Sequence, residues 1–336
     1  MAKRVGNNTL ELERKPCITS YASIVGKKEG EGPMGACFDE VINDASFGEN
    51  TWEKAESELI KKTVALCINK KGLRYEDVQA IFAGDLLNQC TGSAFGVRDL
   101  NIPYCGVYGA CSTMALSLCL ASLAVESGGF NRVIAATSSH FCSAEKQFRY
   151  PMEYGGQRPP SAQWTVTGSG ALMLENKKDS PYIDSIHLGT LCDMGIKDSN
   201  NMGAAMAPAA KKTIADFLND TDTKPSDYDL ILTGDLGDIG SELLRELLLK
   251  ENGIDISFVH KDCGLMIFDR ESQDVHSGGS GCGCSASVLC SKILNSISSG
   301  EYKKVMFVAT GALLSSISSL QGESIPGIAH GVIIKG

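Results

Sequence analysis

The chain repeats part of itself, and this internal duplication restricts its fold more than any other feature of the sequence. Residues 75–85 and residues 226–235 each contain a polar turn, an apolar run and a final Gly-Asp, and the two aspartates lie 150 positions apart. Cys111 and Cys284 each stand at the start of an apolar stretch, 173 positions apart. The threonines that end the next apolar runs are separated by the same 173 positions. Landmarks in one order at equal spacing predict two related halves.

Each half is expected to combine apolar strands with helices. In the first half the pattern predicts an amphipathic helix, a buried strand, a buried helix and another buried strand, at residues 52–71, 78–84, 111–126 and 132–138. In the second half it predicts the same elements in a changed order, at residues 241–251, 229–233, 284–298 and 304–310. Apolar strands that alternate with helices are typical of sheets covered on both faces. We therefore predict an α/β protein whose halves, residues 1–178 and 179–336, enclose the two buried helices.

Composition excludes several classes of protein. A formal charge of −9 with no long basic cluster argues against nucleic acid as a partner. No leader with a basic and then an apolar segment opens the sequence, so we expect an intracellular protein without a signal peptide, whose 13 cysteines are reduced thiols. Structural disulfides and a zinc site are not expected. Residues 100–125 carry no charge, but Pro103 and the interspersed serines favour a buried core helix over a transmembrane segment.

Several motifs carry a family resemblance. They are Ala83–Asn88, Gly109–Thr113, Ala136–His140, Gln147–Pro151, Tyr154–Gly156, Thr165–Gly170, Met206–Ala210 and Ile328–Gly331. A duplicated chain with a cysteine at the start of a buried helix resembles the thiolase and ketoacyl synthase superfamily, which implies a five-layered α-β-α-β-α fold. The longer motifs, spread over nearly the whole chain, resemble the stage V sporulation protein AD family of endospore-forming bacteria.

The resemblance implies a function. It implies binding of dipicolinic acid, pyridine-2,6-dicarboxylate, free or as its calcium chelate, for uptake into the developing spore. The partners it implies are other proteins of the stage V sporulation transport assembly, at which the chain would be peripheral on the forespore or spore inner membrane. A homodimer is expected as well, because the superfamily pairs its sheets across a twofold axis. No cofactor and no resident metal are expected.

Cys111 is the residue whose chemistry matters most. A thiol at a helix N-terminus feels the positive end of the helix dipole, so we expect a lowered pKa and a nucleophile suited to acyl transfer. The alternative is a buried thiol that packs as a small apolar side chain. The two alternatives differ in whether Cys111 reacts.

A condensing enzyme needs further groups to form an oxyanion hole and to move protons. Comparison with the superfamily places Gly234 at the position of an expected histidine, Ser280 at the position of an asparagine or histidine, and Ile325 at that of a second cysteine. All three partners are then lost, which predicts a binding protein without catalysis. The alternative is an active ketoacyl synthase or thiolase that uses Cys111 as its acyl-accepting nucleophile.

The predicted binding pocket lies beside Cys111. A small dianion requires cationic or backbone N–H donors, and calcium requires carboxylate oxygens. For Asp85, as for Asp235, the alternative role is to cap a turn or helix. For His140 and His330 the alternative is a core position with hydrogen-bond partners, and for Arg149 it is to brace a loop or a dimer interface. The ligand-binding residues that we predict are Asp85, Asn88, Cys111, His140, Arg149, Ser280 and His330.

Overall fold

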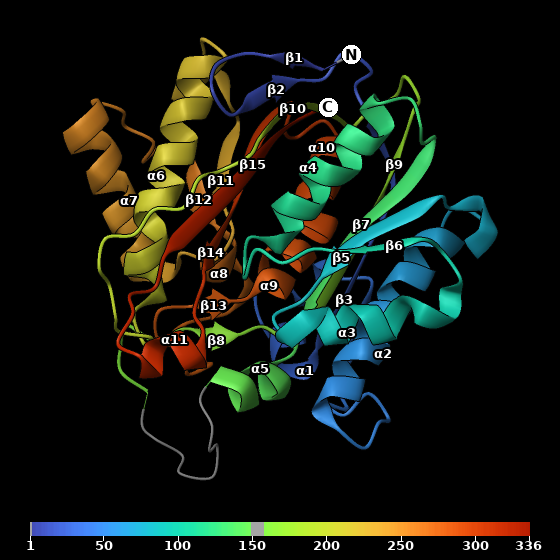
Figure 1. Ribbon diagram of the computed structural model, residues 1–336, viewed down its shortest axis with the longest axis horizontal. Helices are drawn as coiled ribbons and strands as arrows, with labels where there is room; N and C mark the ends of the chain where they lie inside the picture. Colours follow the sequence, from blue (N-terminus) through green and yellow to red (C-terminus); the bar gives the residue numbers. More distant parts are fainter. Residues whose placement is uncertain (1, 149–157) are drawn as a thin grey trace.

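The computed structural model describes residues 2–148 and 158–336, in which strands and helices form layers (Figure 1). The two halves of the sequence supply strands in the same order. From the centre outward, the first half gives β3 (Cys17–Gly26), β9 (Gly168–Glu175), β7 (Arg132–Ser139), β5 (Ala80–Gly84) and β6 (Tyr104–Gly106). The second gives β10 (Tyr182–His187), β15 (Gly327–Lys335), β14 (Lys304–Ala312), β11 (Leu230–Thr233) and β12 (His260–Asp262). The duplication is confirmed, whereas the boundary after residue 178 stays a prediction.

The two sets of strands touch at their inner edges. Tyr182 of β10 pairs with Cys17 of β3. A short N-terminal hairpin, β1 (Lys3–Arg4) with β2 (Thr9–Glu11), lies along β10 of the other half, and β4 (Glu40–Ile42) pairs with β3. The strands are therefore linked into one continuous sheet that folds around the central helices.

Helices separate and cover the two halves of the sheet. Between the halves lie α4 (Thr113–Glu126) and a second run made of α9 (Cys282–Val288), a π-helical turn and α10 (Leu294–Ser298) (Figure 1). The outer faces are covered by α2 (Trp52–Asn69) with α3 (Thr91–Val97) on one side, and by α6 (Met202–Asp220) with α7 (Gly237–Asn252) on the other. These are the five predicted layers.

One predicted correspondence between the halves is wrong. We expected the helix at residues 241–251 to be the counterpart of the helix at residues 52–71. In the structure α6 takes that role, because it precedes β11 and packs on β14 and β15, as α2 precedes β5 and packs on β9 and β3. The helix α7 follows β11 as α3 follows β5. The order of elements is thus the same in both halves.

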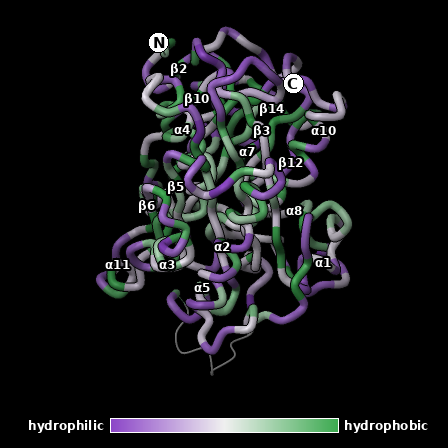
Figure 2. Tube along the Cα trace, turned by 90° about the vertical axis from the view of Figure 1, so that its right-hand side faces the viewer, coloured by the Kyte–Doolittle hydropathy of each residue, from purple (hydrophilic) through white to green (hydrophobic). Residues whose placement is uncertain are grey.

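The two kinds of helix differ in where their apolar residues lie. Thr51 caps α2 by accepting a hydrogen bond from the Lys54 N–H, and its apolar residues recur every three or four positions on the buried face. The central α4 has apolar and small residues all round, and it is buried on nearly every side, as predicted. Hydrophobic residues lie mostly inside the molecule and hydrophilic ones mostly outside (Figure 2). No helix within the described ranges is long and apolar enough to cross a membrane.

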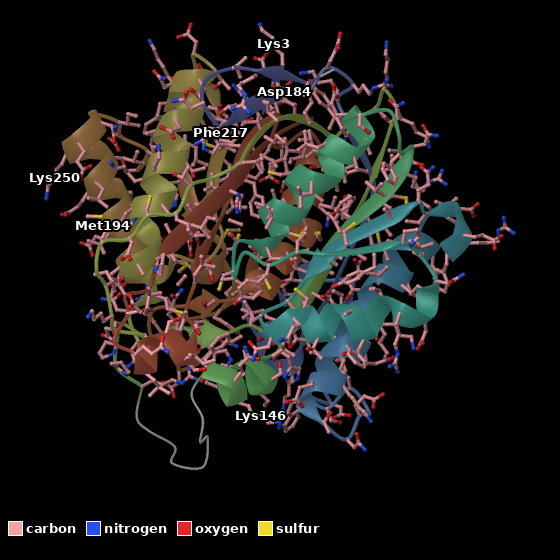
Figure 3. The ribbon with its side chains drawn as sticks, in the orientation of Figure 1. Lys3, Lys146, Asp184, Met194, Phe217 and Lys250 are labelled. Carbon is pink, nitrogen blue, oxygen red and sulfur yellow. The ribbon has the colours of Figure 1, made fainter. Side chains whose placement is uncertain are left out.

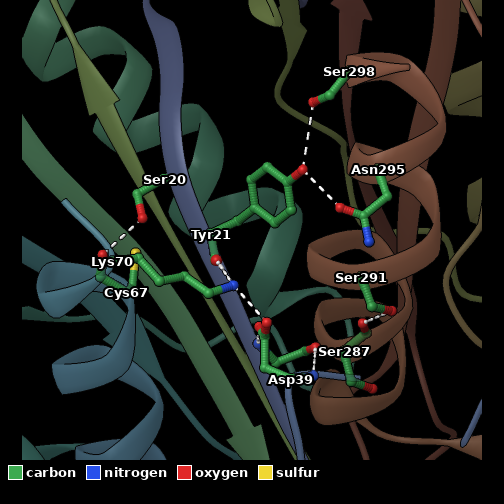
Figure 4. A network of polar contacts seen from close by, with 10 residues as sticks. Ser20, Tyr21, Asp39, Cys67, Lys70, Ser287, Ser291, Asn295 and Ser298 are labelled. Carbon is green, nitrogen blue, oxygen red and sulfur yellow. Dashed lines mark hydrogen bonds and ion pairs between the residues drawn. The ribbon is translucent and has the colours of Figure 1, made fainter. Parts of the chain in front are cut away.

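Polar contacts hold two helix layers on the same strand (Figure 4). The Tyr21 hydroxyl of β3 donates to Asn295 Oδ1 of α10 over 2.8 Å, and Lys70 at the end of α2 donates to the Tyr21 carbonyl over 2.9 Å. Lys70 also pairs with Asp39 at 2.5 Å. The outer and the central layer are therefore fixed to β3 from both of its faces.

Short elements close the end of the molecule at which Cys111 lies. They are α5 (Phe141–Phe148), α11 (Ser316–Leu320), and the two strands β8 (Trp164–Thr165) and β13 (Gly279–Ser280), which pair in parallel. Two further short helices, α1 (Lys27–Gly30) and α8 (Cys263–Ile267), complete the chain. Because side chains alternate along a strand, Trp164 and Thr165 point to opposite sides of β8.

Candidate functional site

A small pocket lies beside Cys111, just before the first turn of α4. The described residues enclose about 40 Å³ there. That volume has room for a water molecule or two, whereas small-molecule sites typically measure several hundred Å³. This Cys111 pocket is lined by Leu86, Tyr108, Ala110, Cys111, Ala144, Glu145, Phe148, Thr165, Ser199, Met202, Ser280, Ala312 and Leu314.

A wider hollow adjoins the Cys111 pocket, and we call it the Asn88 hollow. It measures about 370 Å³ and shares Tyr108, Phe148 and Leu314 with the Cys111 pocket. Within it, the Asn88 N–H donates to Gln147 Oε1 over 3.1 Å, and Gln147 Nε2 donates to Asn88 Oδ1 over 3.2 Å. The two spaces meet at these three apolar side chains, so Asn88 lies at the approach to Cys111.

A carboxylate organises the polar side of the Cys111 pocket. Asp235 follows β11 and is fully buried. Its Oδ2 accepts hydrogen bonds from Ser280 Oγ at 3.0 Å and from the Gly281 N–H at 2.8 Å, and its Oδ1 accepts one from Thr310 Oγ1 at 2.9 Å. Cys111 Sγ lies 3.9 Å from Ser280 Oγ. The thiol therefore faces a hydroxyl that is itself held by a carboxylate.

The expected low pKa of Cys111 is wrong. Burial raises the pKa of its thiol well above the usual value, and the adjacent Asp235 carboxylate raises it further. Burial also raises the pKa of Asp235, although hydrogen bonds from the glycine loop and neighbouring hydroxyls oppose that shift. The dipole of α4 does not offset this increase in the pKa of Cys111, because a buried negative charge next to a thiol disfavours the thiolate. Cys111 is thus held as a neutral thiol.

No imidazole stands at the Cys111 pocket. All five histidines lie in the described part of the chain, and none of them lines this pocket. Gly234, at the position expected for a histidine, packs on β14: a Cβ atom there would lie 3.0 Å from the Ala309 Cα. Ile325 is buried in the core beneath α6. Of the three positions compared with the superfamily, only Ser280 contacts Cys111.

Asp85 lies apart from the Cys111 pocket and fills the capping role. Its Oδ1 accepts the Leu87 N–H at 2.8 Å, and its Oδ2 accepts both the N–H and the hydroxyl of Ser93, at 2.6 and 2.7 Å. The carboxylate is fully buried. These contacts bind the end of β5 to α3.

The two predicted histidines also lie apart from the Cys111 pocket. His140 Nε2 donates to the Ala45 carbonyl over 2.7 Å while its Nδ1 accepts the Cys142 N–H, and its ring stacks on Trp52. His330 Nδ1 accepts the Gly189 N–H at 3.1 Å. Burial is the main cause that lowers the pKa of both rings, that of His330 to about 4. The remaining predicted residue, Arg149, lies outside the described residues.

Sequence reasoning missed two residues that shape the Cys111 pocket. Thr310 holds Asp235 in place, and Glu145 of α5 is a charged member of the lining. The internal repeat contained a signal for Thr310, because the offset of 173 positions that matches Cys111 with Cys284 also matches Thr137 with Thr310. Nothing in the sequence around Glu145 marks it, because its position depends on how α5 packs.

The fold defines the class of protein. The structure is similar to that of 3-oxoacyl-[acyl-carrier-protein] synthase III from Aquifex aeolicus, with a TM-score of 0.57. The alignment covers 96% of this chain and 100% of that chain, and 10% of the residues are identical. For cerulenin-bound OleA from Xanthomonas campestris the identity is 12% over 97% and 98% of the two chains, with a TM-score of 0.60. The fold is therefore the thiolase-like fold of condensing enzymes.

Sequence comparison then gives the family. The profile of the stage V sporulation protein AD family matches residues 6–335. The stage V sporulation protein AD of Bacillus subtilis is 43% identical over 333 residues, which cover 99% of this chain and 98% of that protein. The chain therefore belongs to the stage V sporulation protein AD family, which supports a role in sporulation.

Proposed function

We propose that the chain binds dipicolinic acid without catalysis and serves its uptake into the developing spore. In this role it would act with other proteins of the stage V sporulation transport assembly, peripheral on the forespore or spore inner membrane. The observation that supports a non-catalytic site is the contact of Cys111 with Ser280 and Asp235. A buried carboxylate raises the thiol pKa where acyl transfer would need a thiolate and an oxyanion stabiliser.

The ligand would occupy the Asn88 hollow and extend toward Cys111. Dipicolinate is a planar aromatic ring with a carboxylate on each side of its nitrogen. The amides of Asn88 and Gln147 offer N–H donors to a carboxylate, and the apolar side chains shared by the two spaces offer a surface for the ring. The hollow alone is large enough for such a ligand, free or as its calcium chelate.

Calorimetry with dipicolinate, with and without calcium, tests this function. Wild-type protein should bind, and Leu314→Trp should abolish binding because an indole at the shared wall would fill the junction of the two spaces. Asn88→Ala should weaken binding by about tenfold to a hundredfold, the usual value of a hydrogen bond to a charged group. The matched control is Leu320→Trp on α11, whose side chain is 89% exposed and outside both spaces.

The same preparations decide between binding and condensation. We expect no turnover of acyl-CoA by the wild type. Wild-type protein that releases no binding heat with dipicolinate would contradict the proposed ligand. Acyl-CoA turnover that disappears in Cys111→Ala would instead establish an active condensing enzyme.

A further inference from the structure

A buried ion pair borders the Cys111 pocket. Glu145 of α5 lines the pocket, and its Oε1 lies 3.2 Å from Arg158 Nη2. The side chains of the two residues are only 9% and 17% exposed. Thr165 Oγ1 donates a long hydrogen bond of 3.5 Å to the same Glu145 oxygen. Of the described residues that line the pocket, Glu145 is the only one with a carboxyl side chain.

Arg158 has other contacts that hold its guanidinium in place. Its Nη1 donates to the Gln163 carbonyl over 3.0 Å. Its planar group lies 4.6 Å from the Trp164 ring and 5.1 Å from the Phe141 ring. These contacts do not depend on Glu145, so the cation would stay near the pocket if the carboxylate turned away.

The charges at the pocket are unfavourable for a free dianion. An entering carboxylate meets Glu145 at the wall and Asp235 behind Ser280, and like charges in a buried site repel each other strongly. The cation that would compensate, Arg158, is engaged by Glu145. A carboxylate that replaced Glu145 on the guanidinium would keep the arginine paired, and the displaced Glu145 would have to turn toward solvent to avoid being buried without a cation.

We propose that Glu145 is a competing carboxylate, and that a carboxylate of the ligand takes its place on Arg158. This inference rests on the proposed function, since it assigns Arg158 as the cation that selects a dicarboxylate for that site.

Breaking the ion pair from its two ends tests the exchange. Arg158→Ala should weaken dipicolinate binding by about tenfold to a hundredfold, the value of a charge-assisted contact, and Arg158→Lys should fall between Arg158→Ala and the wild type. Glu145→Gln should strengthen binding by roughly threefold to tenfold, because it removes the competitor and its charge. If the ion pair were merely structural, breaking it at either residue would weaken dipicolinate binding. The diagnostic result is therefore an affinity that falls in Arg158→Ala and rises in Glu145→Gln.

A second ion pair on the same helix provides the control. Lys146 of α5 pairs with Glu53 at 2.6 Å on the surface, at the lower edge of the molecule in Figure 3, and faces neither space. Lys146→Ala and Glu53→Gln should leave the dissociation constant unchanged. Thermal unfolding of each variant shows whether it is folded. Arg158→Lys keeps the test available if Arg158→Ala does not fold.

The outcomes separate this inference from the proposed function. If the wild type binds dipicolinate, equal losses of affinity in Arg158→Ala and Glu145→Gln, or unchanged affinity in both, would overturn the exchange and leave the proposed function standing. A wild type that does not bind dipicolinate at all would overturn both.

Discussion

Glu56 is a buried carboxyl group next to another one. It lies on α2, accepts hydrogen bonds from the hydroxyls of Ser138 and Ser143, and is separated from Asp85 by Gly92, where a Cβ atom would lie 3.2 Å from both carboxyl carbons. Burial raises the pKa of Glu56 to about 8, and the Asp85 charge contributes to the shift. The protonated form of Glu56 is therefore the one that the fold favours.

This pKa makes stability depend on pH. A glutamate titrates near 4.5 in the unfolded chain, so its contribution is complete below that pH and is lost as the pH rises toward 8, by about 1.4 kcal/mol per unit. In Glu56→Gln, the free energy of unfolding should fall less between pH 5 and pH 8 than in the wild type. Urea unfolding across that range measures the difference.

A glutamate one turn earlier on α2 is the matched control for this pH dependence. Burial raises the pKa of Glu53, but the hydrogen bonds it accepts and the charge of Lys146 together lower it overall, so Glu53→Gln should keep the wild-type slope. Parallel curves for Glu56→Gln and the wild type would show that Glu56 is ionised in the folded protein.

At the scale of elements, close contact between β9 and α9 depends on a glycine. A Cβ atom at Gly170 would lie 2.4 Å from the Ala286 carbonyl oxygen, a distance that no side chain tolerates. Gly170→Ala should therefore push the central helix away from the strand and cost about 1 to 3 kcal/mol of unfolding free energy in urea. Gly129→Ala, whose Cβ atom would meet only Ser127 Oγ at 3.3 Å, should change it far less. Equal stability of the two variants would mean that the layers can separate without cost.

Elements with a strong apolar pattern could be predicted from the sequence, and those with a weak one could not. The predicted strand at residues 132–138 is β7, and the predicted helix at residues 111–126 is α4, each within two residues at either end. The central strand β9 begins Gly168-Ser-Gly, so its pattern does not stand out from a loop. The helix α6 contains Pro208, and an internal proline argues against a helix, so the sequence did not indicate α6 as the counterpart of α2.

The same difference applies to the candidate site. Cys111 and Ser280 could be placed together, because the repeat puts Cys111 at the start of one central helix and the superfamily resemblance puts Ser280 in the loop before the other. Asp85 and His140 follow buried strands, which indicates the correct end of the sheet but not the direction of a side chain. Whether such a residue faces a pocket or caps a helix depends on loop conformation, which one sequence does not encode in its periodicity.

At the scale of the whole molecule, one edge of the sheet is open. Among the strands that the structure describes, β6 pairs with β5 alone, and its Cys105 and Gly106 are exposed. Phe95 and Tyr108, 55% and 45% exposed, belong to segments just before and after this strand. An open edge with apolar residues beside it favours pairing with a second copy.

We therefore predict a homodimer through β6. Light scattering at micromolar concentration should give twice the 35.7 kDa of one chain. Cys105→Arg should shift the mass toward the monomer, because it would bring two like charges together across the twofold axis. Lys250→Ala on α7, a change of a residue whose side chain is 71% exposed on the opposite outer layer, is the control that should remain dimeric. A monomeric wild type would contradict the prediction.

The packing around Gly234 bears on evolution as well as on chemistry. Because a Cβ atom at this position would press on the backbone of β14, a histidine there would need more space between β11 and β14 than this chain provides. Replacing Gly234 by histidine would therefore not restore a condensing enzyme in one step, since β11 and β14 would first have to move apart. A histidine at this position would therefore have to be accompanied by substitutions in the neighbouring residues of β14.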